Sequence, residues 1–70
     1  MSEAKQKRMF VRKSNEFYTI DFANESGDSI ENRIITNPIR VLHVVEEKIA
    51  AGFFISENSL SKLRSDASRF

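Results

Sequence analysis

Few side chains in this 70-residue sequence have the types and spacing that catalysis or metal binding requires. His43 is the only histidine, the chain has no cysteine, and the acidic residues are scattered, so we expect no metal site. Glu46 and Glu47 are adjacent and diverge on a helix, so they do not form a facing carboxylate pair. The only glycines, Gly27 and Gly52, do not make a phosphate-binding loop. We therefore expect no enzymatic activity and no cofactor.

Basic residues are the other group to consider, and they gather near the two ends of the sequence. Eleven lysines and arginines against ten acidic residues give a formal net charge of only +1, which is not typical of nucleic-acid-binding proteins. Lys5, Lys7 and Arg8 belong to an N-terminal basic cluster, whereas Lys62 and Arg64 lie near the C-terminus. The N-terminal cluster has two interpretations: a solvated tail, or an arm that contacts the phosphates of a nucleic acid.

The length of the chain limits the size of its core. Seventy residues predict a single domain, because chains of this length are too short to form two cores. A core this small rarely supplies more than about 3–5 kcal/mol, and no disulfide can add to it, so good packing or a partner such as a second copy is needed. No apolar run is long enough for a signal peptide or a membrane span, so we expect a cytoplasmic protein with no membrane partner.

The N-terminal half has the composition of β-strands. Residues 1–7 are polar and lack periodicity, which predicts a flexible basic arm, and residues 8–70 are predicted to form one small α+β domain. Residues 9–11 and 16–23 are rich in aromatic and β-branched residues and are separated by turn-forming residues, so they predict a hairpin. A third strand is expected over residues 29–36, after a turn-forming segment.

Alternation along the second strand predicts which of its side chains enter the core. Tyr18, Ile20 and Phe22 alternate with the other residues of the strand, so these three should face the core and Phe17 and Thr19 should face away. In the third strand the pair Ile34–Ile35 breaks the alternation, and we expect a bulge there or a strand covered on both faces.

The C-terminal half has the signals of helices. Asn37 is a favoured N-cap, Pro38 suits the first helical position, and Gly52 can end the helix in a left-handed conformation. The apolar face of this helix is expected to comprise Val41, Leu42, Val45 and Ile49.

A second helix is expected at the C-terminus. Residues 53–55 are apolar but too short for a helix, so they predict a buried linker or a short fourth strand. Ser56 or Asn58 can cap the terminal helix that follows. Its apolar face is expected to contain Leu60, Leu63, Ala67 and Phe70. The predicted order is therefore β-β-β-α-(β)-α.

Residues 46–64 have the spacing of small and apolar residues that two crossing helices require. Ala50 falls at the small position of the first helix, and Phe54 stands where a turn glycine is usual. The apolar positions are occupied by Ile49, Phe53, Ile55, Leu60 and Leu63. This pattern resembles the helix-turn-helix motif of bacterial DNA-binding proteins.

The resemblance implies a small protein that regulates transcription, commonly as a dimer, by placing the terminal helix in the major groove of double-stranded DNA. The residues available for DNA would be Ser56, Asn58, Ser59, Lys62 and Arg64, with Lys5, Lys7 and Arg8 as a steadying arm. The same residues also fit a simpler interpretation, in which two core helices are joined by an apolar connection.

A second functional hypothesis needs no nucleic acid. The chain would be a small adaptor or inhibitor, of the kind that phages and mobile elements encode, which binds another protein through its sheet or an apolar patch. Phe17 is left outside the core by the alternation, and Val11 and Thr19 are expected beside it. The low net charge favours this hypothesis, whereas the spacing in residues 46–64 favours DNA binding, which is the function that we predict from the sequence.

Overall fold

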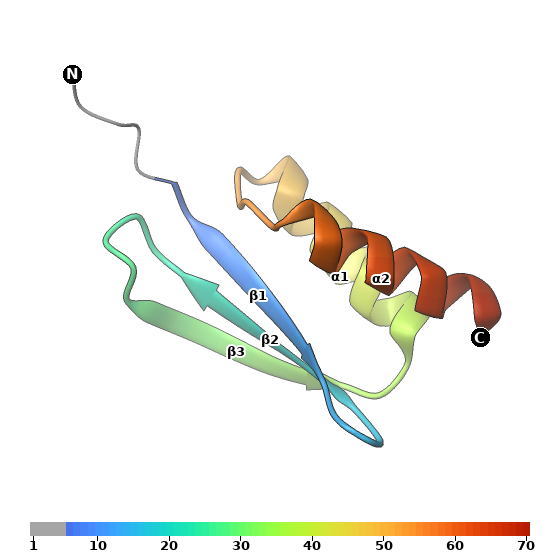
Figure 1. Ribbon diagram of the computed structural model, residues 1–70. Coiled ribbons are helices and arrows are strands. Elements are labelled where there is room, and N and C mark those ends of the chain that lie inside the picture. The colour runs from blue at the N-terminus through green and yellow to red at the C-terminus, as the bar shows by residue number, and fades with distance from the viewer. Residues whose placement is uncertain (1–5) are drawn as a thin grey trace.

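A computed structural model describes residues 6–70 and shows a three-stranded antiparallel sheet followed by two helices (Figure 1). This α+β fold and its order of elements confirm the prediction. The elements are β1 (Arg8–Lys13), β2 (Tyr18–Ala23), β3 (Ser29–Ile35), α1 (Pro38–Ala50) and α2 (Glu57–Arg69).

The sheet is a simple meander in which β2 lies between β1 and β3. The pairing of β1 with β2 sets Met9 opposite Phe22 and Val11 opposite Ile20. Residues directly opposite each other in antiparallel strands share a face, so these apolar side chains form one surface of the sheet. Both helices lie over that same surface in Figure 1, which leaves the other surface of the sheet bare.

The core fills the space between the covered face of the sheet and the two helices. Alternation along β2 is confirmed, because its three predicted core residues are all buried. Val41 and Val45 of α1 and Leu63 of α2 pack on them. The buried hydrophobic residues are Met9, Tyr18, Ile20, Phe22, Ala23, Val41, Val45, Ile55 and Leu63.

The ends of the helices follow the local signals in the sequence. The side chain of Asn37 accepts a hydrogen bond from the Ile39 N–H at 2.8 Å and caps α1. Gly52 follows the C-cap of α1 with a φ of +102°, a conformation that favours glycine. The Ser56 side chain caps α2 by accepting a hydrogen bond from the Ser59 N–H at 3.3 Å. Ile49 is half exposed, because it lies in the last turn of α1 at the edge of the core.

The two outer strands of the sheet have different surroundings. Phe54 lies beside β1 as a single parallel bridge, so the expected short fourth strand is reduced to one residue. Its N–H donates to the Lys7 carbonyl at 2.8 Å, and its carbonyl accepts from the Met9 N–H at 2.8 Å. The predicted arm therefore ends in an ordered residue at Lys7, and its first part, residues 1–5, lies outside the described residues.

β3 is exposed along its length except at Ile35, which packs against the core. Its pairing with β2 contains one irregularity, where Phe22 pairs with Glu31 and Ala23 pairs with Ser29. Ile30 is therefore the extra residue of a bulge. The irregularity lies near the start of β3 rather than at Ile34–Ile35, and the strand is not covered on both faces, so both expectations for that pair were wrong.

Candidate functional site

The residues expected to contact DNA through α2 do not form one continuous surface. Ser56 and Ser59 are used in the cap, where their hydroxyl oxygens lie 3.0 Å apart. Ser59 and Lys62 line a shallow hollow between α2 and β1, so they face the sheet side of the helix. Arg64 is two residues after Lys62, about 200° around the helix axis from it. Asn58 is exposed in the first turn.

The connection between α1 and α2 differs from a helix-turn-helix turn. It comprises residues 51–56, which is longer than the three to four residues typical of that motif. Phe54, at the position of the usual turn glycine, holds the connection against β1 through its backbone. Ala50, expected at the close helix crossing, is exposed. The backbone of the connection therefore serves the sheet as well as the two helices.

The N-terminal basic residues are divided between described and undescribed parts of the chain. Lys5 lies outside the described residues. The Lys7 ammonium lies 5.3 Å from the centre of the Phe53 ring, and the Arg8 guanidinium lies 5.8 Å from the centre of the Phe54 ring. Both are cation–π distances, so these two side chains cover the aromatic pair of the connection.

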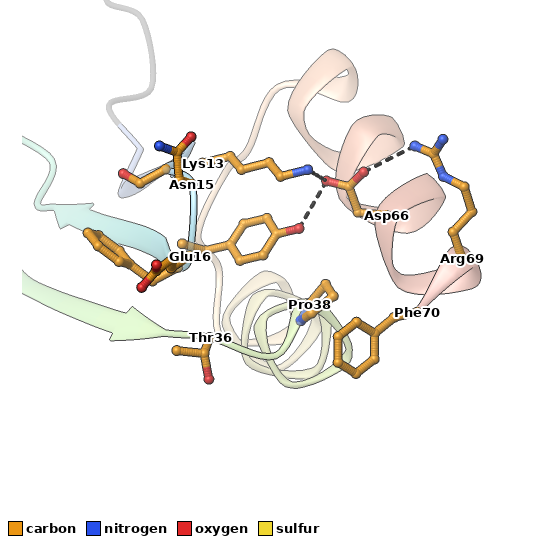
Figure 2. A pocket seen from close by; sticks show the side chains of 11 residues that line it. Lys13, Asn15, Glu16, Thr36, Pro38, Asp66, Arg69 and Phe70 are labelled. Carbon is orange, nitrogen blue, oxygen red and sulfur yellow. Dashed lines mark hydrogen bonds and ion pairs between the residues drawn. The ribbon is translucent and has the colours of Figure 1, made fainter.

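A polar cluster joins the hairpin of β1 and β2 to the last turns of α2. The Tyr18 hydroxyl donates to an Asp66 carboxylate oxygen at 3.1 Å, and the Lys13 ammonium lies 3.5 Å from the same oxygen. Arg69 approaches the other carboxylate oxygen at 3.3 Å, so that Lys13 and Arg69 converge on Asp66 from two sides (Figure 2). This cluster was not predicted from the sequence, because its partners in the hairpin and in α2 are far apart along the chain.

The cluster shifts the pKa of two of its members in directions that favour the native contacts. Burial is the main cause of the raised pKa of Tyr18, and the hydrogen bond to Asp66 adds to it. The hydrogen bond from Tyr18 is the main cause of the lowered pKa of Asp66, with Lys13 and Arg69 contributing. Asp66 is thus held as an ionised carboxylate within an ion-pair network. A carboxylate with three such partners is a structural tie rather than a free general base.

A hollow of about 500 Å³ lies beside this cluster. It is bounded by the β1–β2 turn, the start of α1 and the end of α2, and Phe17 and Phe70 supply its large apolar side chains. Figure 2 shows that Phe70 and Pro38 lie on one side of Asp66, with Glu16 and Asn15 across the opening. The hollow is wide and open at one end of the molecule, so it does not enclose a ligand.

The uncovered face of the sheet has a more unusual composition than this hollow. We use this name for the surface formed by Phe10, Arg12, Thr19, Asp21, Asn32 and Ile34, which the strand registers place in two cross-strand rows. One row runs from Phe10 through Asp21 to Asn32, and the other runs from Arg12 through Thr19 to Ile34. Phe10, on β1, is 52% exposed, and Ile34, on β3, is 66% exposed. Between them, Arg12 lies 3.4 Å from Asp21, and Thr19 is half-buried. An apolar side chain thus flanks each side of a polar centre.

The structure separates the three residues expected for a protein interface. Thr19 is in the middle of the uncovered face, but Val11 faces the helices and packs against the core, because it lies opposite Ile20. Phe17 is 36% exposed and lines the hollow at the end of the sheet. Phe10 was not among the predicted residues, although alternation places it on the outer face once its neighbours enter the core.

Among residues 6–70, no group of three or more histidine, cysteine or acidic side chains is placed to hold a metal ion. Neither α1 nor α2 is long and apolar enough to cross a membrane, and these are the helices of the described chain.

No family model, curated protein or solved structure matches this chain in the comparisons. Its function must therefore be inferred from the composition and geometry of the described surfaces.

Proposed function

We propose that this protein is a small adaptor or inhibitor that binds another protein through the uncovered face of its sheet. The observation that carries the proposal is the exposure of Phe10 and Ile34 on the sheet surface that neither helix covers. An antiparallel sheet with one solvated face usually has polar residues on that face. Two large apolar side chains are costly to expose there, and contact with a partner would remove them from water.

The polar residues between Phe10 and Ile34 are also typical of a protein interface. Protein interfaces commonly combine a few apolar anchors with hydrogen-bonding groups that fix the orientation of the partner. Arg12, Asp21 and Thr19 supply such groups, and the ion pair between the first two is exposed enough for both to find new partners. The cytoplasm is the compartment we propose, which the absence of cysteine supports.

Affinity capture with defined variants tests the proposal. The purified protein would be used as bait beside a Phe10→Ser, Ile34→Ser double variant and an Ile39→Ser control. Ile39 is 51% exposed on α1, so the control removes a similarly exposed apolar side chain from the helix layer. We expect the wild-type and control baits to retain a partner protein, and we expect the double variant not to retain it. Equal retention by all three baits would contradict the proposal.

DNA binding is a second candidate, and one observation favours it. Among residues 6–70, neither Lys62 nor Arg64 lies within ion-pair distance of a carboxylate, so both charges are available to phosphates. Fluorescence anisotropy of a labelled duplex at low and moderate salt tests this candidate. Binding that weakens with salt and is lost in a Lys62→Ala, Arg64→Ala double variant would support it. Unchanged affinity in that variant would show that α2 is not the DNA-binding helix.

A further inference from the structure

The outer edge of β3 is an unpaired strand edge. β3 is last in the order of the sheet, and among residues 6–70 no backbone hydrogen bond reaches its outer side. The other edge differs, because Phe54 pairs with part of β1. Exposed strand edges present unpaired N–H and carbonyl groups, which readily pair with another strand.

The sequence of β3 is complementary to itself in the antiparallel direction. Residues 30–34 read Ile-Glu-Asn-Arg-Ile. If two copies of β3 pair about a two-fold axis at Asn32, Glu31 lies opposite Arg33 of the partner subunit. The same register sets Ile30 opposite Ile34 of the partner subunit, and symmetry repeats each contact. Opposite charges and apolar side chains directly across an antiparallel pair are both stabilising. A symmetric dimer requires this kind of self-complementary surface.

We propose that the partner of this edge is a second copy of the chain, paired antiparallel through β3 about Asn32 to form a continuous six-stranded sheet.

The charges of β3 are placed where such pairing would use them. Glu31 lies opposite Phe22 and Arg33 opposite Ile20, so both side chains are on the helix side of the sheet. They form an ion pair at 2.9 Å and are nevertheless exposed. In the dimer, each carboxylate would lie between its own Arg33 and the partner's Arg33. Four charges of alternating sign would then occupy one patch.

A positively charged hollow next to the same edge also favours a second copy of the chain as the partner. It has a volume of about 720 Å³ and lies between the end of β3 and α1. Among the described residues that line it, Arg33 and Arg40 are charged and none is acidic, while Ile35 and Val44 form apolar walls. The proposed register brings Glu31 of the partner subunit to this positively charged hollow. The bulge at Ile30 lies at the end of the paired segment, so the central three residues keep a regular ladder.

The charged contacts of this dimer are separate from the proposed binding face. Glu31 and Arg33 face the helix side, whereas Phe10 and Thr19 lie on the uncovered face. Ile34 is the one residue that the two proposals share, because it lies on the uncovered face and also opposite Ile30 of the partner subunit. The charge variants at Glu31 and Arg33 keep Ile34 and Phe10, so a loss of dimerisation in them leaves the uncovered face intact. The single variants Phe10→Ser, which leaves β3 unchanged, and Glu31→Lys, which leaves the uncovered face unchanged, therefore let the two proposals fail separately.

Sedimentation equilibrium of the full chain over a range of concentrations tests the dimer. Glu31→Lys sets an ammonium opposite Arg33 of the partner subunit, and Arg33→Glu sets two carboxylates opposite each other. Each variant alone thus replaces two attractive pairs with two repulsive ones. We expect the dissociation constant to rise about tenfold or more for each. Glu47→Lys makes the same charge change as Glu31→Lys, but on an exposed residue of α1. It should leave the dissociation constant unchanged. Circular dichroism would verify that every variant is folded.

The decisive arm mixes the two weakened variants. Glu31→Lys has only positive charges at the two positions, and Arg33→Glu has only negative ones, so a mixed dimer has an opposite-charge pair at both contacts. We expect the mixture to dimerise more tightly than either variant alone. A wild-type protein that stays monomeric at the highest concentration would overturn the proposal. A mixture no tighter than its components would also overturn it, because the pairing would then not be antiparallel about Asn32.

Discussion

The two faces of the sheet have nearly the same backbone and opposite environments. On the covered face, Met9 lies opposite Phe22, and both are buried beneath the helices. One residue along each strand, on the uncovered face, Phe10 lies opposite Asp21, and the ring remains half exposed. The covered face shows how much apolar surface the fold needs. The apolar residues on the other face are in excess of that need, which is why we assign them to a partner.

The largest expected effect comes from the covered face. Phe22→Ala should cost about 3–5 kcal/mol, because it leaves a cavity in the centre of the core. This is comparable to the whole stability of a domain of this size, so the variant should be largely unfolded. Phe10→Ala removes the same side chain from the uncovered face and should change the free energy of unfolding by less than about 0.5 kcal/mol. Urea denaturation followed by circular dichroism measures both. Equal losses of stability in the two variants would contradict the proposed difference between the faces.

An intermediate effect is expected from the polar tie at the margin of the covered face. Tyr18→Phe keeps the buried ring but removes the hydroxyl that donates to Asp66. A typical hydrogen bond contributes about 1 kcal/mol, so a loss of that order is expected near neutral pH. Thermal unfolding of the variant and the wild type at several pH values measures this contribution. An unchanged stability would mean that the tie does not hold α2 on the hairpin.

The pH dependence of that tie has a definite sign at each end. The pKa of Asp66 is below its ordinary value of 3.8 in the folded protein, so its contribution is present above pH 3.8 and is lost as the pH falls through the lowered value. The pKa of Tyr18 is above its ordinary value of 10.0, so its contribution is present below pH 10 and is lost as the pH rises through the raised value. Tyr18→Phe should therefore abolish the loss of stability that Tyr18 causes at alkaline pH, and it should reduce the loss that Asp66 causes at acid pH.

The smallest effect is expected on the uncovered face itself. Asp21→Ala breaks the ion pair with Arg12, whose side chain is 74% exposed. Exposed ion pairs contribute about 0–1 kcal/mol, so stability should hardly change. Raising the salt concentration should have a similarly small effect on the wild type. A large destabilisation in the urea titration would show that this face is part of the structural framework, contrary to the comparison.

The elements of the fold could be predicted where the signal is local. Asn37 with Pro38, Gly52 and Ser56 each specify a helix end through their own backbone chemistry, and all lie where the sequence placed them. Alternation in β2 specified the core of the sheet for the same reason, because burial of one face requires a period of two.

The features that local signals cannot specify were not predicted. Tyr18 and Asp66 are 48 residues apart, and nothing in either segment indicates that they meet. The inward position of Val11 depends on its register with Ile20, which the composition of a single strand does not define. Phe54 pairs with β1 only because the chain returns there after α1. Long-range pairing thus accounts for most of what the structure of the candidate site added to the sequence predictions.

The most direct test of the uncovered face is site-specific photo-cross-linking in cells that produce the protein. A benzophenone amino acid would replace Phe10 in one variant and Ile39 in the other, since these residues are 52% and 51% exposed on opposite layers of the molecule. Our account predicts a discrete cross-linked protein from position 10 that is absent from position 39 and disappears when Ile34→Ser is added. The same products from both positions, or none from position 10, would contradict it.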